Sequence, residues 1–280
     1  MLVTRIEDKF GNTVDYTYNA NGQLNRIESS DNRVITLTYV DLVFGTATKS
    51  VVDKVTVNGR IWDYNYDANG SLNEVILPNT QKWAFDNGGD IYGTWREWFP
   101  PHFMFGDECA SELSMTPHFI TMTHPYGMKG SFYLDANCFG QVNVPEIEKA
   151  NPWMTAEKQS HWVRRENRSI VLDSKILTFP DNTTYTWDYQ YSEKKGLFVD
   201  QTATLEHNIT FNGAQRSDLK STKIVQPNGD YEIHYFDRTY GKPQNNLLHK
   251  EVYESDGKLL QRQSYTHSYS PAYGLSLIHI

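Results

Sequence analysis

An internal repeat constrains the fold of this chain more than any single residue does. Residues 15–25 return as residues 63–73, 48 positions later, and eight of the eleven positions are identical. In the first copy Tyr16 and Tyr18 stand at period two, so both side chains are expected to leave a β-strand on the same face. The second copy repeats this spacing with Tyr64 and Tyr66.

Each copy also contains an Asn-Gly pair, which is the strongest short turn signal because both residues tolerate the positive φ of a type I′ turn. The return strand then begins at a leucine, and the unit is predicted to be a β-hairpin that is used twice. The residues that define these hairpins are Tyr16, Tyr18, Asn21, Gly22 and Leu24, then Tyr64, Tyr66, Asp67, Asn69, Gly70 and Leu72.

The same rhythm continues beyond the repeat. Residues 34–39 and 51–57 alternate as strands do, and Asn58-Gly59 predicts a turn into residues 61–64. A Pro-Asx turn followed by an aromatic or apolar strand recurs, because Pro presets the first turn position and Asx or Gly accepts the second. These turns begin at Pro78, Pro180 and Pro227. Strands at such spacing predict an all-β fold of antiparallel hairpins.

The repeated residues resemble the Rhs/YD-repeat family, whose repeats read as an aromatic strand, Tyr-Asp, a small residue, Asn-Gly, a variable residue and Leu. Residues 66–72 (Tyr-Asp-Ala-Asn-Gly-Ser-Leu) fit closely, and residues 18–24 fit with Asn19 in place of Asp. Residues 253–259 form a weaker third relative. The resemblance covers residues 1–86 and extends, on hairpin rhythm, to about 178–270. It implies a curved sheet or partial spiral wall.

Three segments followed by a short tail, residues 275–280, are therefore expected. Residues 1–86 form YD-repeat hairpins, and residues 178–274 continue the same wall. Residues 87–177 hold both cysteines and four of the seven tryptophans, and are predicted to be an irregular β segment or plug. Within them, residues 123–134 read as strand, turn and strand, while residues 151–163 read either as a short helix or as a loop. Asn212-Gly213 predicts a surface turn.

The two ends of the sequence are unusual. The first residues lack the basic start and apolar run of a signal peptide and read like the middle of a repeat. Residues 275–280 resemble a translated sequencing-adapter tail and are interpreted as a non-native end. Both observations suggest a fragment of a longer gene product.

Composition excludes two function classes. The net charge of −8 argues against binding to a nucleic-acid backbone, which requires clustered Lys and Arg. The sequence contains no apolar stretch of the roughly 18 residues that a transmembrane helix needs. With 280 residues, the chain is long enough for one large β domain or two smaller ones.

The middle segment is the best place to look for chemistry. Cys109 and Cys138 either form a disulfide or serve as small buried residues. A metal site there, or a Cys–His pair using His124, lacks the usual ligand and nucleophile spacings. We favour histidines hydrogen-bonded to backbone, and we expect no catalytic, cofactor or metal residue. The candidate metal ligands are His102, His118, His124, Asp107, Glu108 and Cys109.

Aromatic residues cluster between Trp95 and Phe103. They form either a surface that stacks on carbohydrate or a plug that packs against the sheet. We favour the plug, because exposed patches of that size are uncommon on soluble proteins.

The resemblance implies a function. In the Rhs/YD-repeat family the repeats wrap into a shell around a C-terminal toxin, in bacterial proteins that are secreted or displayed at the cell surface. The family's self-cleavage motif contains Asp-Pro dipeptides, and none occurs here. We therefore expect a non-catalytic wall section, whose partners are the remaining repeats and the toxin of a parent protein. The alternatives are a module that binds cell-surface glycans and a hydrolase seated in residues 87–177.

Overall fold

The computed structural model describes residues 2–88, 118–145, 166–192, 195–199, 201–241, 243–269 and 276–279. Twenty strands and one short 3-10 helix are assigned within these residues. They are β1 (Arg5–Glu7), β2 (Thr13–Tyr18), β3 (Leu24–Ser29), β4 (Val34–Phe44), β5 (Ala47–Val57), β6 (Arg60–Tyr66), β7 (Leu72–Ile76), β8 (Lys82–Asp86), β9 (His118–Thr123), β10 (Lys129–Gly140), β11 (Glu166–Thr178), β12 (Thr184–Tyr191), η1 (Leu205–His207), β13 (Ile209–Phe211), β14 (Ala214–Arg216), β15 (Leu219–Val225), β16 (Tyr231–Asp237), β17 (Leu247–Tyr253), β18 (Leu259–Ser264), β19 (Thr266–Tyr269) and β20 (Ser276–His279).

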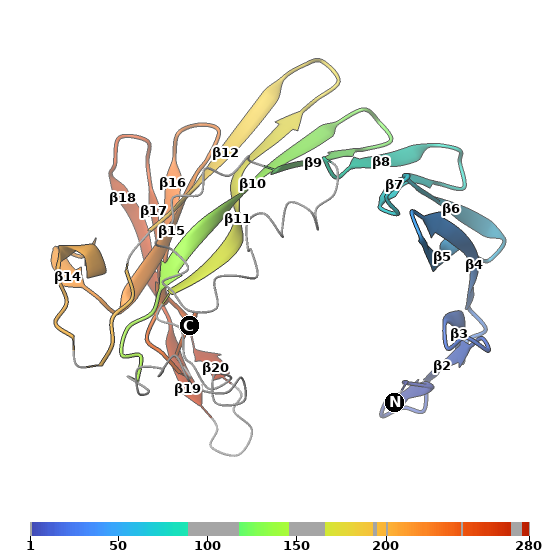
Figure 1. Ribbon diagram of the computed structural model, residues 1–280, viewed down its shortest axis with the longest axis horizontal. Helices are drawn as coiled ribbons and strands as arrows, with labels where there is room; N and C mark the ends of the chain where they lie inside the picture. Colours follow the sequence, from blue (N-terminus) through green and yellow to red (C-terminus); the bar gives the residue numbers. More distant parts are fainter. Residues whose placement is uncertain are drawn as a thin grey trace. The chain divides into compact units, whose positions relative to one another are not determined.

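Sixteen strands form one sheet whose spatial order follows the chain, from β1 through β12 and then from β15 through β18 (Figure 1). The pairs from β1–β2 to β8–β9 are antiparallel, and so are those from β12–β15 to β17–β18. The hairpins β13–β14 and β19–β20 form separate two-stranded sheets. The predicted all-β class of antiparallel hairpins is confirmed, whereas the predicted curvature stays a prediction.

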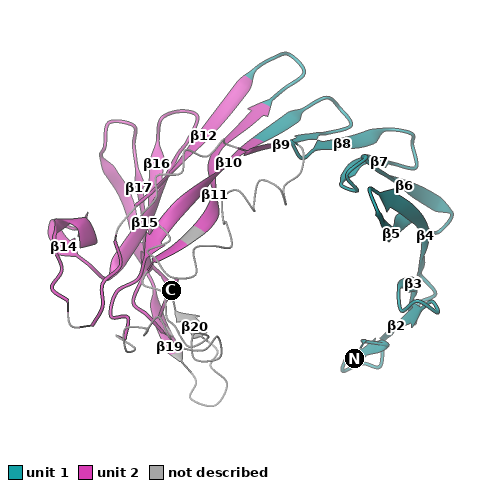
Figure 2. Cartoon of the chain, in the orientation of Figure 1, with its two compact units in different colours: residues 1–91, 120–131, 178–183 teal, residues 92–119, 132–177, 184–280 magenta. Residues whose placement is uncertain are grey.

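The chain divides into two compact units (Figure 2). Unit 1 comprises residues 1–91, 120–131 and 178–183, and unit 2 comprises residues 92–119, 132–177 and 184–280. The strands β9, β10 and β11 each contain residues of both units.

Nine turns share one backbone geometry. In each, the first residue donates its N–H to the carbonyl of the fifth, and the fourth donates its N–H back to the carbonyl of the first. The fourth residue takes positive φ, as in a type I turn followed by a left-handed residue that forms a bulge. These residues are Gly11, Gly22, Asn32, Gly70, Thr80, Gly127, Asn182, Gly229 and Gly257.

The prediction of turns at Asn21-Gly22 and Asn69-Gly70 is therefore confirmed, but the predicted turn type is wrong. Gly22 and Gly70 have φ of 76° and 83°, whereas neither asparagine before them has positive φ. A type I′ turn needs positive φ at both central residues. The difference follows from loop length, because each loop contains three residues and such loops take a type I turn followed by a left-handed residue. The side chain of Asn19 or Asp67, before the loop, accepts hydrogen bonds from the loop backbone. The turns predicted at Asn58-Gly59 and Asn212-Gly213 are also present, and these are two-residue turns with positive φ at both residues.

Unit 1 has one apolar and one charged face. Residues that lie opposite one another on adjacent strands form apolar rows. The rows are Tyr16, Ile27, Ile35 and Val57; then Leu37, Val55 and Trp62; then Tyr64, Val75 and Trp83. Because side chains alternate along a strand, the neighbouring residues lie on the other face. There Lys54 pairs with Asp63 at 2.7 Å, and Lys82 pairs with Glu74.

Unit 2 contains a buried core. The hairpin β13–β14 brings Ile209 and Phe211 against Leu219 of β15 and Tyr235 of β16, and all four side chains are buried. The rings of Phe211 and Tyr235 meet edge to face with centroids 4.7 Å apart. A core forms here because a second layer covers the sheet.

The described part of the middle segment is mainly β-structure. The strands β9 and β10 lie within it, β11 begins in it, and all three belong to the large sheet. Residues 151–163, interpreted above as either a short helix or a loop, lie outside the described residues, as does the cluster from Trp95 to Phe103. Residues 276–279, within the predicted non-native tail, pair with β19.

Among the described residues, no helix has the length and hydropathy needed to span a bilayer.

Candidate functional site

The repeated hairpin is the feature that most closely ties sequence to structure, and its two copies fold alike. Tyr16 lies opposite Ile27 in the first copy, and Tyr64 lies opposite Val75 in the second. In both, the register shifts just before the second tyrosine, so that one extra residue enters the return strand as a β-bulge. Because the strand bearing the tyrosines has no extra residue, its two tyrosines leave the same face, as predicted.

The Asp or Asn after the second tyrosine closes the turn. Asn19 Oδ1 accepts hydrogen bonds from the N–H groups of Asn21, at 3.0 Å, and Gln23, at 2.9 Å. Asp67 Oδ1 accepts the equivalent pair from Asn69, at 2.8 Å, and Ser71, at 2.9 Å. A carboxylate and a carboxamide oxygen both act as acceptors, which explains why the repeat tolerates Asn in place of Asp.

The second tyrosine of each copy joins neighbouring strands. The hydroxyl of Tyr18 donates to the carbonyl of Val3 at 2.7 Å, and that of Tyr66 donates to the carbonyl of Val52 at 2.8 Å. Val52 belongs to β5, the strand before β6, and Val3 lies just before β1. Tyr39 and Tyr191 make the same contact, with Leu24 and Leu172. Burial raises the pKa of Tyr66, so its hydroxyl stays a donor.

The third copy, predicted as a weak relative, folds in the same way. Tyr253 lies opposite Leu259 after a register shift, as Tyr18 lies opposite Leu24 and Tyr66 opposite Leu72. The turn from Glu254 to Lys258 has the same two backbone hydrogen bonds. Its tyrosine differs in one respect, because the Tyr253 hydroxyl donates to the Glu251 carboxylate rather than to a backbone carbonyl.

Glu251 is the centre of a buried polar cluster in unit 2. Its side chain is almost fully buried and accepts hydrogen bonds from the hydroxyls of Tyr253, at 2.6 Å, and Tyr235, at 3.1 Å. Arg262 donates to its other oxygen at 2.6 Å and lies over the ring of Phe211. Burial and the Glu251 charge raise the pKa of Tyr235, and they raise the pKa of Tyr253 to about 12.

Arg238 is a second buried charge, with 1% of its surface exposed. Its guanidinium donates to the carbonyls of Ser217, at 2.6 Å, and Lys195, at 3.1 Å, and also to those of Gly140 and His207. Burial lowers its pKa to about 10. The Arg238 side chain therefore satisfies backbone carbonyls from four separate segments of the chain.

The candidates for metal binding or catalysis lie only partly within the described residues. His118 is buried at the start of β9, and the Nδ1 of His124 accepts the N–H of Tyr126 at 3.1 Å. Cys138 of β10 is disulfide-bonded, while Cys109, His102, Asp107 and Glu108 lie outside the described residues. Within the part that the structure describes, no three His, Cys, Asp or Glu side chains are placed to hold a metal ion.

Sequence reasoning missed Glu251 and Arg238 as organising residues. Glu251 is a charged residue in the strand β17, Arg238 follows directly after β16, and neither belongs to a motif. The one available signal was local, since Glu251 precedes the tyrosine of the third repeat copy by two positions and therefore shares its face.

Comparison with known proteins gives little beyond this geometry. No family model matches the sequence, and no curated protein sequence matches it. Among solved structures, a porin-like protein from Bacteroides vulgatus matches with 11% identity over 97% of this chain and 100% of that chain, at a TM-score of 0.21.

Two structures of TcdB2-TccC3, one titled with TEV and one with Cdc42, match at 10% identity and TM-scores of 0.17 and 0.16. This chain spans 17% of the length of those two chains. At these scores the similarities assign neither a fold family nor a function to this chain.

Proposed function

We propose that this chain is a wall section of an Rhs/YD-repeat shell, a non-catalytic part of an exported bacterial protein that encloses or presents a C-terminal toxin. The supporting observation is the reuse of one hairpin, with its Asx-closed turn, bulge and tyrosine, in a sheet whose strand order follows the chain. Such a sheet grows by adding hairpins at its edge, which suits a container better than a cleft enzyme.

The two faces of unit 1 support the same role. One carries apolar rows that end at Trp83, and the other carries ion pairs such as Lys54 with Asp63. None of residues 2–88 is buried, so the apolar face is only partly covered by its own neighbours. A wall that has contents on one side and water on the other needs this asymmetry.

Self-association tests the proposal. In the main sheet, β1 and β18 are the terminal strands of the order, and a wall section is expected to pair further strands there. We expect the purified chain to form concentration-dependent oligomers in sedimentation velocity experiments. Ile6→Lys in β1 together with Leu260→Pro in β18 is expected to abolish them, because both side chains are exposed and charge or proline blocks strand pairing.

The control is Thr36→Glu, which places a charge in β4 where the strand pairs with Arg26 of β3 and with Thr56 of β5. It should leave association unchanged. A chain that stays monomeric at high concentration, or oligomers that persist in the edge variants, would contradict the wall role. We also expect neither self-cleavage of the purified chain nor growth arrest on its expression.

A further inference from the structure

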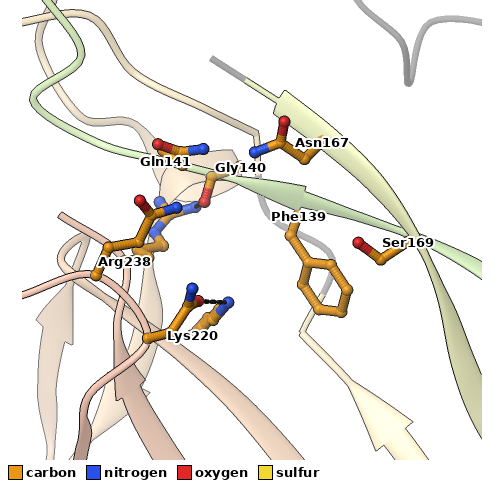
Figure 3. Close-up of a pocket in the computed structure, with 9 residues that line it drawn as sticks. Phe139, Gly140, Gln141, Asn167, Ser169, Lys220 and Arg238 are labelled. Carbon is orange, nitrogen blue, oxygen red and sulfur yellow. Dashed lines mark hydrogen bonds between the residues drawn. The ribbon is translucent and has the colours of Figure 1, made fainter. Parts of the chain in front are cut away.

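A small cavity of about 110 Å³ lies within unit 2, between β10, β11, β15 and the connection after β16 (Figure 3). A single water needs only about a tenth of such a volume, whereas pockets for drug-sized ligands are several times larger. The cavity therefore suits a ligand of a few heavy atoms. Its lining is polar except for the Phe139 ring, and it includes Gln141, Asn167, Ser169, Lys220 and Asn245.

Lys220 supplies a positive charge at this cavity. Its ammonium donates to Asn245 Oδ1 and lies 4.9 Å from the centroid of the Phe139 ring. Among the described residues, no carboxylate forms an ion pair with it. Burial and the nearby Arg238 charge lower the pKa of Lys220, which is the expected result for an ammonium without a counterion.

Gln141 supplies the second, independent feature. Its side chain is 8% exposed, and its Oε1 atom has no hydrogen-bond partner among the described residues. A buried acceptor left without a donor destabilises the folded protein, so the site is incomplete as it stands. A hydroxyl or amine of a ligand would complete it. In Figure 3, Gln141 and Lys220 line different parts of the cavity.

We propose that this cavity binds a small carboxylate that also carries a hydroxyl or amine donor. The carboxylate pairs with the Lys220 ammonium, and the donor group reaches Gln141 Oε1. The amide of Asn167 and the hydroxyl of Ser169 offer further hydrogen bonds, and the Phe139 ring packs against the ligand's carbon atoms. This proposal does not depend on the proposed wall function, because ligand binding in the cavity does not require pairing at the edge strands.

Three small probes of nearly equal size test each group in turn. Lactate has both the carboxylate and the hydroxyl, propionate lacks the hydroxyl, and lactamide lacks the charge. Saturation-transfer NMR on the unaltered protein reads binding from the methyl signals. We expect affinity to decrease from lactate to propionate to lactamide, by about tenfold for loss of the charge. Inorganic phosphate, which offers charge without the carbon skeleton, is expected to compete weakly.

Two variants assign the contacts. Lys220→Met keeps a long side chain beside Phe139 and should weaken lactate binding about tenfold or more. Gln141→Leu should remove the preference for lactate over propionate. The control is Lys223→Met, on the same strand but with its ammonium 4.0 Å from the Tyr231 ring, which should bind lactate as the unaltered protein does.

Equal signals from all three probes, or no saturable signal from lactate, would overturn the proposal and leave a cavity that holds water only. Lactate binding that survives in a folded Lys220→Met variant would overturn it as well. The comparison among probes uses the unaltered chain, so it stays decisive even if a variant fails to fold.

Discussion

Unit 1 and unit 2 build hairpins of the same kind but bury them differently. None of residues 2–88 in unit 1 is buried, whereas Leu219, Arg238 and Glu251 in unit 2 are each 1% exposed or less. The difference comes from covering segments. In unit 2 the hairpin β13–β14 packs on the sheet, and Arg238 holds the connections around it.

This comparison separates two sources of stability. In unit 1 the stabilising contacts are between adjacent strands, through paired side chains, tyrosine hydroxyls and turn closures. In unit 2 a compact core is added, together with two buried charges whose removal leaves unsatisfied groups. Variants that act on one source and not the other should therefore affect the two units to different extents.

The largest effect is expected for Arg238→Met. The variant leaves the carbonyls of Ser217, Lys195, Gly140 and His207 without their donor, and each unsatisfied carbonyl costs about 1–3 kcal/mol. We expect a loss of more than about 3 kcal/mol in unfolding free energy. Hydrogen exchange with mass spectrometry should show deprotection in unit 2 while residues 13–29 keep their protection.

The control for this variant is Arg60→Met in unit 1, where an exposed guanidinium lies 5.5 Å from the Trp62 ring. It should change stability by less than about 1 kcal/mol. Equal losses for both variants, or deprotection spread evenly over both units, would mean that the units do not differ as described.

Glu251→Gln is expected to rank second. The amide keeps the size of the side chain but removes the charge that faces Arg262, and breaking a buried pair costs about 3 kcal/mol. Urea unfolding measures the loss. Glu254→Gln, which affects an exposed pair with Lys258 at 3.4 Å, should change little, and a comparable loss there would contradict the role given to burial.

The same cluster predicts how stability depends on alkaline pH. The folded pKa of Tyr253 is about 12, above the usual value of about 10, so the folded state holds its proton more tightly than the unfolded state. The stability that this contributes is present below about pH 10 and is lost as the pH rises towards 12. Tyr253→Phe should flatten that part of the stability curve.

The turn glycines give a matched pair within unit 1. Gly22 and Gly70 both have positive φ, so alanine at either costs about 1–2 kcal/mol. At Gly70 an added Cβ would also lie 2.9 Å from the Phe44 ring, whereas at Gly22 it would meet nothing within 4 Å. Gly70→Ala should therefore destabilise more than Gly22→Ala by about 1 kcal/mol or more.

The control is Phe44→Ala in the Gly70→Ala background, which should remove the extra cost in a double-mutant cycle. An additive cycle would show that Phe44 does not press on this turn.

The smallest effect is expected for Tyr66→Phe, which removes the hydrogen bond to the Val52 carbonyl and should cost about 1 kcal/mol. Tyr64→Phe, on the same strand, removes a hydroxyl for which the described residues provide no partner, and should be nearly neutral. Thermal unfolding gives the midpoint temperature of each variant. Equal decreases in the two midpoints would show that the hydrogen bond from Tyr66 does not stabilise the sheet.

Much of the sheet was predictable because the turns are encoded locally. Turns at Asn21-Gly22, Pro78, Pro180 and Asn212-Gly213 lie where the sequence predicted them. The bulge in the return strand of each hairpin was not predictable, since it depends on pairing between strands. Nor were the contacts of Arg238, because Gly140 lies 98 positions away in the chain.

The central claim is that the matched hairpins belong to one sheet, joined through β4 and β5. Methyl NOE spectroscopy of a sample labelled at Ile, Leu and Val tests it directly. We predict cross-peaks from Ile27 to Ile35 and from Ile35 to Val57, because these residues lie opposite one another on adjacent strands. A folded protein in which Ile27 and Val57 show no NOE to Ile35 would contradict the claim.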